Sequence, residues 1–399
     1  MIKNIKQNLK RKVLFFIGIY NFYYFRLVET KKIKNADLVF FFPYYHTGGA
    51  EKVHLNIVKA LEKQNIYIIF THLSATKNYH SAFKTHANIV EINNIKNKKS
   101  AVLNKFLENK ILKTINKSKS IHSVFGSNTD YFYQLLPKIK SDIYKVDLIH
   151  ALSENDPREL QFVNSCQFID SRICINTKAK EDLISIYNNN KLSKKLSDKL
   201  VIIQNGVDVN KGLSYKKDNN RILKFGFIGR WSAEKRPEIF LDVAKQITHK
   251  YPKVEFVMAG TGMKSNLSKI DNSGVSFLGE ITDPKKLDEL YKSLTAVVIT
   301  SVYEGFPMVI MESMIFGTIP IATNVGGISQ HINHMKNGLL ISSEHKASIV
   351  ERFVENISYL IENEQYLKII STNANNYALD NFNIDKFNTS YQVLFRKKP

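Results

Sequence analysis

Short apolar runs alternate with amphipathic stretches of helix length along most of this chain. The runs 37–44 and 66–73 are rich in Val, Ile, Phe and Tyr, and residues 48–64 between them carry apolar side chains at helical spacing. Further strand-like runs lie at 120–126, 145–152, 171–176 and 199–204. Strands that are apolar on both faces and alternate with helices predict a parallel sheet covered on both sides.

The second half of the chain repeats this pattern. Residues 221–229 predict a strand, and a helix is expected over about 234–250. Short β-branched runs follow at 253–260, 275–279, 295–301 and 319–325. Two such halves predict two doubly wound, Rossmann-like α/β domains. The expected parts are an amino-terminal segment 1–36, a first domain 37–204, a polar linker 205–220, a second domain 221–379 and a tail 380–399.

The composition favours certain classes of binding partner but does not distinguish among them. The chain has 399 residues and a formal net charge of +21, which favours phosphate-bearing partners such as nucleic acid, anionic lipid or phosphorylated small molecules. Cys166 and Cys174 are too few for a disulfide framework, and no CxxC or Cys/His cluster indicates a metal. We expect a cytoplasmic protein, because a reducing compartment fits this cysteine usage.

The first forty residues are more basic than the rest, with nine Lys or Arg against Glu29 and Asp37. They contain the apolar stretch Val13–Phe25, which is too short to span a bilayer, since a spanning helix needs about 20 residues. No small-residue cleavage site follows it. We favour a segment lying on an anionic membrane surface. A helix packed on the first domain, or a signal or spanning segment, remains an alternative.

The loop and helix over 301–317 carry two acids. Pro307 suits a helix start and Gly317 a helix stop, so a helix is expected over about 307–316. Glu304 then precedes this helix and Glu312 lies on it. Eight helical residues span about 12 Å, whereas the carboxylates of glycosidases lie about 5–10 Å apart. The two acids are therefore expected to act as separate hydrogen-bond acceptors for a hydroxyl-rich ligand, unless they are ordinary surface acids.

Two further loops lie where strands end, which is where parallel sheets bind ligands. Arg230 and Lys235 follow a strand five positions apart and could neutralise a diphosphate, together with the free amides of Met308 and Val309 at the expected helix start. The alternative is solvated surface charge.

The glycines Gly48 and Gly49 would let the backbone approach a ligand at a helix start, although a tight turn also explains them. There is no GxGxxG, no GxxxxGK[ST] and no DxD pattern in the sequence. Positive charge from these loops would have to replace a metal ion.

Several of these stretches together resemble glycosyltransferase family 4, the retaining glycosyltransferases of GT-B fold. The stretches are EGFPMVIME (304–312), GRWSAEKRPEIF (229–240), GGAEK (48–52), QNGVD (204–208), VMAGTG (257–262), FLGEITD (277–283) and ATNVGGISQHINHMKNGLLI (322–341). The resemblance covers the whole second domain, and the first domain at its glycine loop and in general pattern.

The resemblance implies a role for each matching residue. Arg230 and Lys235 would hold the diphosphate of a nucleotide-sugar donor, and Glu312 would take the ribose hydroxyls. Glu304 would hold the donor sugar. The remaining implied donor-binding positions are the backbone of Gly305, Phe306 and Pro307, followed by Met308, Val309 and Gly260. The resemblance further implies that amides near Ile281 face a base, which would be uracil. Gly48 and Gly49 would approach the donor phosphate and the acceptor.

This chain departs from the family pattern at two places. Gln330 stands where the family often has Glu after its second Gly-Gly. The family often has a His of the first domain near the reacting carbon, and here His122 and His150 both lie at strand ends. Either could lie near the reaction centre, and either could be structural or contact the acceptor.

The resemblance implies transfer of a sugar to a hydroxyl with retention of configuration, without a metal or other cofactor, in a cleft between the domains. The tail 380–399 would pack back on the first domain. A glycan or lipid-linked glycan acceptor, in surface polysaccharide or lipopolysaccharide assembly, fits a basic protein at the inner face of the cytoplasmic membrane. A nucleotide-sugar epimerase, an inactive scaffold and a protein binding nucleic acid or another anionic surface remain alternatives. No nucleic acid is expected as a partner, because no recognised binding module is present.

Overall fold

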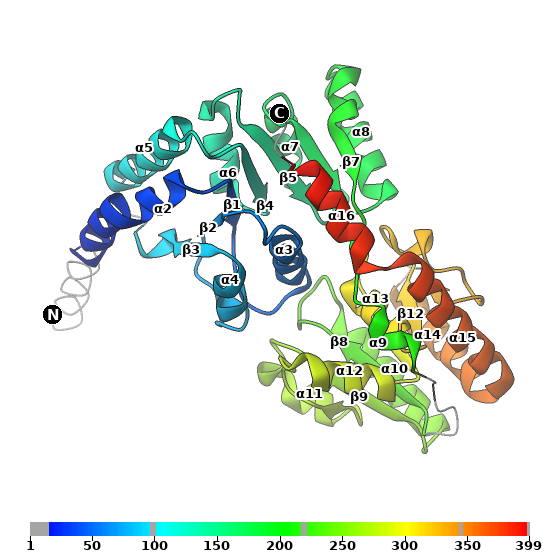
Figure 1. Cartoon of the computed structure of the whole chain (residues 1–399). Helices are drawn as coiled ribbons and strands as arrows, with labels where there is room; N and C mark the ends of the chain where they lie inside the picture. The colour runs from blue at the N-terminus through cyan, green and yellow to red at the C-terminus, as the bar shows by residue number, and fades with distance from the viewer. Residues whose placement is uncertain (1–15, 96–100, 216, 218–221, 343–345, 397–399) are drawn as a thin grey trace.

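The computed structural model consists of two parallel sheets with helices on their faces, so the prediction of a two-domain GT-B architecture is confirmed (Figure 1). The structure describes residues 16–95, 101–215, 217, 222–342 and 346–396. Parts of the expected amino-terminal segment (1–15), linker (216 and 218–220) and tail (397–399) lie outside the described residues, as does residue 221 of the expected strand 221–229.

The first sheet has seven parallel strands in the order β3-β2-β1-β4-β5-β6-β7. Most of these strands are buried along their whole length, which explains their continuous apolar sequence. Their bounds are β1 Leu38–Phe42, β2 Ile66–Phe70, β3 Asn88–Glu91, β4 Ser123–Ser127, β5 Tyr144–Ile149, β6 Ser171–Cys174 and β7 Leu200–Ile202.

Helices cover both faces of this sheet. They are α3 Gly49–Ala60, α4 His80–His86, α5 Ala101–Lys117, α6 Asp130–Leu135, α7 Glu159–Ser165 and α8 Thr177–Asn189, with short 3-10 turns η2 Ile92–Asn94, η3 Leu136–Lys138 and η4 Lys194–Lys199. Before the sheet, residues 16–24 are helical and continue into the π-helical turn η1 Phe25–Glu29 and α2 Thr30–Lys34. Among the described residues, no helix is both long enough and apolar enough to cross a membrane.

The second sheet has six parallel strands in the order β10-β9-β8-β11-β12-β13. They are β8 Lys224–Ile228, β9 Glu255–Ala259, β10 Ser276–Phe277, β11 Ala296–Ile299, β12 Ile319–Thr323 and β13 Leu339–Ile341. The helices and turns around them are α9 Asn210–Leu213, α10 Pro237–Lys250, η5 Lys264–Asn266, α11 Leu267–Asp271, α12 Pro284–Ser293, α13 Met308–Met314, η6 Ile328–Gln330, α14 Lys346–Glu362 and α15 Glu364–Asn381. The edge strands β3 and β13 were not among the expected strands, since they have only four and three residues.

The chain crosses between the two domains at two points that lie side by side. Val207 on the outward path and Asn383 on the return path form a parallel bridge, with the Val207 amide donating to the Phe382 carbonyl at 2.8 Å. After the return, α16 (Ile384–Leu394) packs on α3, and the Phe395 ring lies 5.7 Å from the ring of Phe40 in β1. The last helix of the chain therefore completes the core of the first domain (Figure 1).

The carboxyl ends of the two sheets face each other. Asn176, which follows β6, donates its side-chain amide to the Gly305 carbonyl, which follows β11, at 2.9 Å. A side chain on Gly305 would also overlap the carbonyl of His150, at the end of β5. The strand-to-loop segments of both domains thus meet in one crevice, where parallel sheets place their ligand sites.

Candidate active site

The loop between β11 and α13 is held by an arginine that the sequence did not single out. Arg236, at the start of α10, donates to the carbonyls of Thr300 (2.6 Å) and Ser301 (3.0 Å). Pro307 caps α13 in an extended conformation, and the helix begins at Met308, one residue later than expected. Gly317 has φ +68°, as a helix stop requires. The helix has seven residues, because it ends at Met314 rather than at 316.

Glu304 and Lys235 form an ion pair at the mouth of the crevice. The Lys235 ammonium donates to the Glu304 carboxylate at 2.5 Å, and the Ser301 hydroxyl donates to the same oxygen at 2.6 Å. The Glu304 side chain is only 10% exposed, and that of Lys235 is 26% exposed. Two residues that lie 69 positions apart in the sequence are thus held together, and both contacts use the same carboxylate oxygen of Glu304.

Arg230 lies on the same edge but is mostly in solvent. Its guanidinium contacts Glu234 at 3.1 Å, and its side chain is 57% exposed. Its charge also acts on Glu51 of the first domain, where it lowers the pKa of that carboxyl against the larger effect of burial. An exposed ion pair of this kind adds little stability, which leaves the guanidinium available for an anion.

Glu312 is bound from both sides. Lys52, on α3 of the first domain, donates to one carboxylate oxygen at 2.5 Å, and the Tyr291 hydroxyl donates to the other at 2.8 Å. Burial lowers the pKa of Lys52, but the nearby Glu312 carboxylate outweighs it and raises that pKa above its ordinary value. Lys52 is therefore charged at neutral pH, and this ion pair links the two domains directly.

The glycine loop lies opposite the start of α13. Gly48 is the extended cap of α3 and has the carboxylate of Glu51 beside its Cα, so a Cβ there would displace that carboxylate. A Cβ on Gly49 would lie 4.0 Å from the Met308 side chain across the crevice. Burial raises the pKa of Glu51. The loop thus brings backbone, rather than side chains, close to the second domain.

Gly305 is packed too tightly for any side chain. A Cβ there would overlap the His150 carbonyl and the Ile175 side chain. The Phe306 ring turns away from the crevice and packs on His331, with 4.5 Å between ring centres. The Phe306 side chain is buried, and the Val309 amide lies in the first turn of α13.

The structure separates the two candidate histidines. His150 follows β5 at the carboxyl edge, beside Gly305, whereas His122 precedes β4 and bonds through its backbone to Asp37, just before β1. His122 therefore lies at the amino edge of the sheet, and its expected place near the reaction centre is wrong. The sequence pattern predicts one strand over 120–126, whereas β4 begins only at Ser123.

His150 has a second histidine as its partner. Its Nε2 lies 3.0 Å from Nε2 of His54, which is fully buried on α3 and stacks on Phe42 with 4.2 Å between ring centres. Burial lowers the pKa of His150 to about 4, helped by the charge of Arg158. Burial also lowers the pKa of His54 well below its usual range, and His150 adds to this effect. Both rings are therefore neutral at pH 7.

The expected base-binding loop also adjoins the first domain. Asn78 donates to Glu280, next to Ile281, at 2.8 Å. Gly260 has φ +143°, and a Cβ there would overlap the Gly229 carbonyl. Glycine is needed at 260 because the ends of β8 and β9 approach each other at that point.

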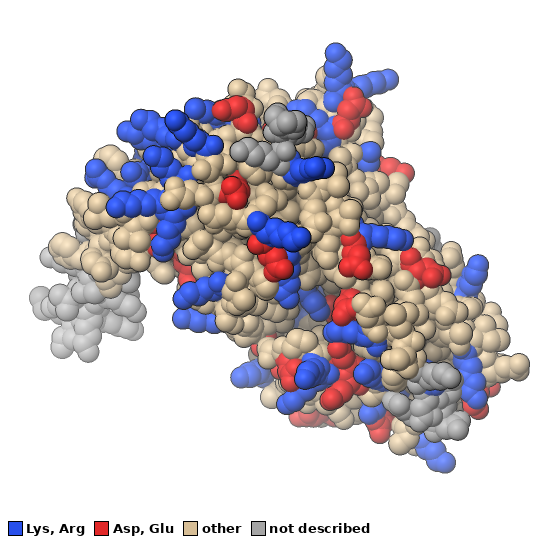
Figure 2. Space-filling view, viewed as in Figure 1, with Lys and Arg blue, Asp and Glu red and all other residues tan. Residues whose placement is uncertain are grey.

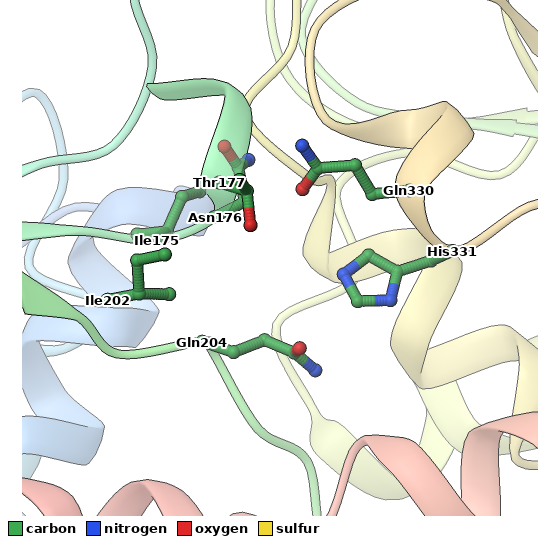
Figure 3. A pocket seen from close by; sticks show the side chains of 7 residues that line it. All are labelled: Ile175, Asn176, Thr177, Ile202, Gln204, Gln330 and His331. Carbon is green, nitrogen blue, oxygen red and sulfur yellow. The ribbon is translucent and has the colours of Figure 1, made fainter. Parts of the chain in front are cut away.

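A polar cavity of about 400 Å³ lies beside this crevice, between the domains. Figure 3 shows Asn176, Gln204, Gln330 and His331 pointing toward it. Gln330 thus lines this cavity, where the family pattern often has Glu. Burial lowers the pKa of His331 to about 4. None of the described lining residues carries a formal charge at neutral pH, so the cavity suits neutral hydroxyls better than phosphate.

Sequence reasoning missed several residues of the site. They are Lys52, His54, Asn176, Arg236 and Tyr291. Lys52 and Arg236 stand inside the quoted motifs and could have been found there. No local pattern distinguishes the other three residues, whose partners lie far away in the sequence.

Comparison with known proteins agrees with this geometry. Residues 214–377 match the family model described as Glycosyl transferases group 1. An uncharacterized glycosyltransferase of Methanocaldococcus jannaschii is 30% identical over 222 residues, covering 50% of this chain and 52% of that protein. An Escherichia coli UDP-Gal:alpha-D-GlcNAc-diphosphoundecaprenol alpha-1,3-galactosyltransferase is 27% identical over 210 residues, covering 47% and 51%. The chain thus spans about half the length of the curated relatives it matches.

Solved structures match over nearly the whole chain. Anabaena HepE in complex with UDP and glucose has a TM-score of 0.71 and 19% identity, covering 91% of this chain and 100% of that one. The pneumococcal O-GlcNAc transferase GtfA in complex with UDP and GlcNAc has a TM-score of 0.72 and 14% identity, covering 90% and 98%. Identities this low establish the fold alone. The second domain of this chain is therefore similar to the glycosyl transferases group 1 family over residues 214–377, and the whole chain shares the two-domain fold of these solved structures.

Proposed function

We propose that this chain is a retaining glycosyltransferase, which moves a sugar from a nucleotide diphosphate to a hydroxyl group. The observation that carries the proposal is the convergence of Lys235, Glu304 and Glu312 on one crevice between the domains, with Arg230 at its edge. Two cations and two buried acids at the ends of parallel strands suit a ligand with a diphosphate and many hydroxyls.

Each charged group would bind one part of the donor. Arg230 and Lys235 would hold the diphosphate, while Glu304 would accept hydrogen bonds from hydroxyls of the transferred sugar. Glu312 would accept from the ribose, and the loop around Ile281 would face the base. The backbone of Gly48 and Gly49 would approach the donor phosphate, because no side chain at either position intervenes.

The leaving diphosphate gains negative charge as the glycosidic bond breaks. Lys235 and Arg230 would stabilise that charge more strongly in the transition state than in the bound donor, which is what accelerates the reaction. In a front-face reaction, the diphosphate oxygen would take the proton of the attacking hydroxyl. Contact between the domains at Gly305 would exclude the water that otherwise hydrolyses the donor.

The donor is proposed to be a UDP-sugar and the acceptor a glycan or lipid-linked glycan. Support comes from the printed names of similar proteins, which include UDP complexes and an enzyme named for a diphosphoundecaprenol-linked substrate. A place in surface polysaccharide or lipopolysaccharide assembly follows from such an acceptor. We propose that neither metal nor other cofactor takes part, so the assays below contain EDTA.

A panel of UDP-, GDP- and ADP-sugars, tested by thermal unfolding, identifies the donor. A ligand at 100 times its dissociation constant stabilises the native state by about 2.7 kcal/mol. One nucleotide series is expected to raise the midpoint, and release of the nucleoside diphosphate should then require an added acceptor. Donor consumed without any acceptor would point to an epimerase or hydrolase instead.

Lys235→Met tests the diphosphate assignment. We expect loss of the stabilisation by the nucleotide and at least about a hundredfold lower kcat/KM, because a charge-assisted contact to the leaving group is removed. Lys245→Met, on the exposed face of α10, is the matched control and should turn over normally. Normal turnover by Lys235→Met would refute the assignment.

A further inference from the structure

The amino-terminal helix of the described chain carries a row of exposed apolar side chains. Tyr20, Tyr24 and Leu27 are 70%, 48% and 61% exposed and follow each other at helical spacing. The opposite side of the same helix is buried, with Phe25 and Ile33 fully inaccessible. The helix is thus firmly seated on the domain, while Tyr20, Tyr24 and Leu27 on its outer side are exposed.

This helix lies against α5 (Figure 1), which carries exposed apolar side chains of its own. The Asn21 side chain donates to the Asn94 carbonyl at 3.2 Å, just before the start of α5. On α5, Val102 and Phe106 are 65% and 57% exposed, one turn apart. The exposed apolar side chains of both helices, which we call the docking face, are Phe16, Ile17, Tyr20, Tyr23, Tyr24, Leu27, Val102 and Phe106.

Basic side chains surround the docking face. Residues 16–36 and 101–119 contain nine Lys or Arg and only two acids, and Figure 2 shows basic side chains gathered over α2 and α5. Both acids are already paired, Glu29 with Lys32 at 3.0 Å and Glu108 with Lys138. The surroundings of the docking face therefore have an uncompensated positive charge.

We propose that the docking face is a binding site for the surface of an anionic lipid bilayer. Amphipathic helices with aromatic and aliphatic side chains on one face and Lys or Arg beside them bind at this interface. Tyrosine rings lie at headgroup depth, while the positive charge of lysines is attracted to anionic lipid. The sequence led us to expect such a role for the amino-terminal segment alone, and the structure adds α5 to it.

Other occupants fit the docking face less well. In a two-fold dimer through this face, the same lysines of both copies would meet and repel each other. Nucleic acid would satisfy the lysines, but it would leave Leu27 and Val102 against a charged backbone. An anionic bilayer satisfies the apolar and the basic side chains together.

This inference goes beyond the proposed transfer reaction and can fail independently of it, because binding to vesicles needs neither donor nor acceptor. The full chain should sediment with vesicles of phosphatidylcholine and phosphatidylglycerol, and much less with phosphatidylcholine alone. Binding should weaken as salt increases, since charge attraction is screened. The variant Lys235→Met should bind the vesicles as the unaltered chain does.

Two sets of variants, each with a matched control, test whether the apolar and the basic residues of the docking face contribute to vesicle binding. Tyr20→Ser, Leu27→Ser and Phe106→Ser together should weaken vesicle binding at least about tenfold, whereas the equally exposed Leu160→Ser, Leu213→Ser and Val393→Ser should not. Reversal of Lys105, Lys113 and Lys117 to Glu should have a similar effect, and the same reversal of Lys245, Lys264 and Lys269 should not.

Some results would overturn the proposal. The first is an absence of binding to anionic vesicles by the full chain at low salt. The second is equal weakening by the docking-face variants and their controls, which would indicate diffuse charge. The third is a concentration-dependent dimer that the docking-face variants dissociate, which would assign the face to a second copy. Thermal unfolding of each variant verifies that it is folded.

Discussion

At the scale of single residues, the site depends on ionisable groups whose partners come from distant parts of the sequence. His54 is such a partner, because it is placed to fix the tautomer of His150. Its Nδ1 is buried and has no hydrogen-bond partner among the described residues. An orphaned buried N–H is rarer than an orphaned acceptor, which places the His54 proton on Nε2, where it donates to Nε2 of His150. His150 then carries its own proton on Nδ1.

The variant His54→Phe tests this positioning role. We expect kcat to fall about tenfold with little change in the donor KM, because the His150 tautomer is no longer fixed. The stacking on Phe42 is kept in this variant. His54→Gln restores a donor near the same place and should recover most of the activity, and nitrogen NMR shifts of His150 should report the tautomer directly. Full activity of His54→Phe would refute the role.

A second residue-scale feature supports the first domain itself. Arg172 and Asp147 are 1% and 0% exposed and form a bidentate pair, with Nη2 of Arg172 at 2.8 Å from the carboxylate. Arg172 also donates to the Phe162 carbonyl (3.0 Å) and the Tyr187 hydroxyl (2.6 Å). Burial lowers the pKa of Arg172, and Asp147 more than compensates by raising it. Each nitrogen of this buried guanidinium therefore donates a hydrogen bond within the fold.

Replacing Arg172 by Met should destabilise the fold by about 3–5 kcal/mol, because it leaves the Asp147 charge buried without a partner. Chemical unfolding of the purified variant measures the loss. Lys178→Met, which breaks an exposed pair with Asp182, is the matched control and should leave stability unchanged within error. A loss below about 1 kcal/mol for Arg172→Met would contradict the structural role proposed for this ion pair.

At the scale of elements, the loop between β11 and α13 decides how closely the domains meet. Its Gly305 carbonyl accepts from Asn176 of the first domain and from the Gly327 amide of the second, both at 2.9 Å. The next strand-to-helix loop is equally crowded, since a Cβ on Gly326 would overlap the Glu304 carbonyl. The close contacts at Gly305 and Gly326 are therefore made by backbone atoms rather than by side chains, and these contacts position Glu304.

Gly305→Ala should reduce kcat/KM at least about a hundredfold while the thermal midpoint changes little. The added Cβ meets the His150 carbonyl and Ile175, so the domains cannot seat against each other, and misplacement by about 1 Å can cost that much activity. Gly18→Ala is the matched control, because a Cβ there finds ordinary contacts of 3.6 Å and 3.8 Å. Equal activity of the two variants would contradict the proposed closure.

At the scale of the whole molecule, two domains are joined by paired crossings and by the ion pair between Lys52 and Glu312. Val207 and Asn383 fix the relative path of both crossings, and α16 fastens the end of the chain to α3. A donor that reaches Glu312 must share or displace Lys52, since both carboxylate oxygens are bound. The proposed donor binding would therefore be coupled to the contact between the domains through the Glu312 side chain.

The stability of the whole fold should depend on pH between about 6.5 and 4. The pKa values of His150 and His331 are lowered to about 4 by burial, while an unfolded chain protonates these rings near pH 6.5. Below pH 6.5 the unfolded state binds more protons, so the stability present at pH 7 is lost as pH falls toward 4. Urea unfolding at pH 7, 5.5 and 4.5 measures this loss.

The variant His331→Phe should flatten that pH dependence. It removes one of the buried imidazoles and keeps a ring against Phe306. His249→Phe, an exposed histidine at the end of α10, is the control and should leave the slope unchanged. A slope that is identical in all three chains would show that other groups control the acid sensitivity.

The sequence by itself determined the two sheets and the positions of the main site loops. Continuous apolar runs could only be strands buried on both faces, and acids or glycines directly after them had to lie at one edge. Boundaries were less certain, so the helix expected over 307–316 begins and ends slightly differently, and the edge strands β3 and β13 were missed. His122 was misplaced for the same reason, because a strand starting one residue after it puts it at the wrong edge.

Only the tertiary structure decided which of these groups meet. The pairs Lys52–Glu312, Lys235–Glu304 and His54–His150 join residues 260, 69 and 96 positions apart. It also brought α5 beside the amino-terminal helix and so created the docking face. Local patterns in a sequence report the period and burial of one element, whereas the partner of a charged group depends on how two separately folded sheets are turned toward each other.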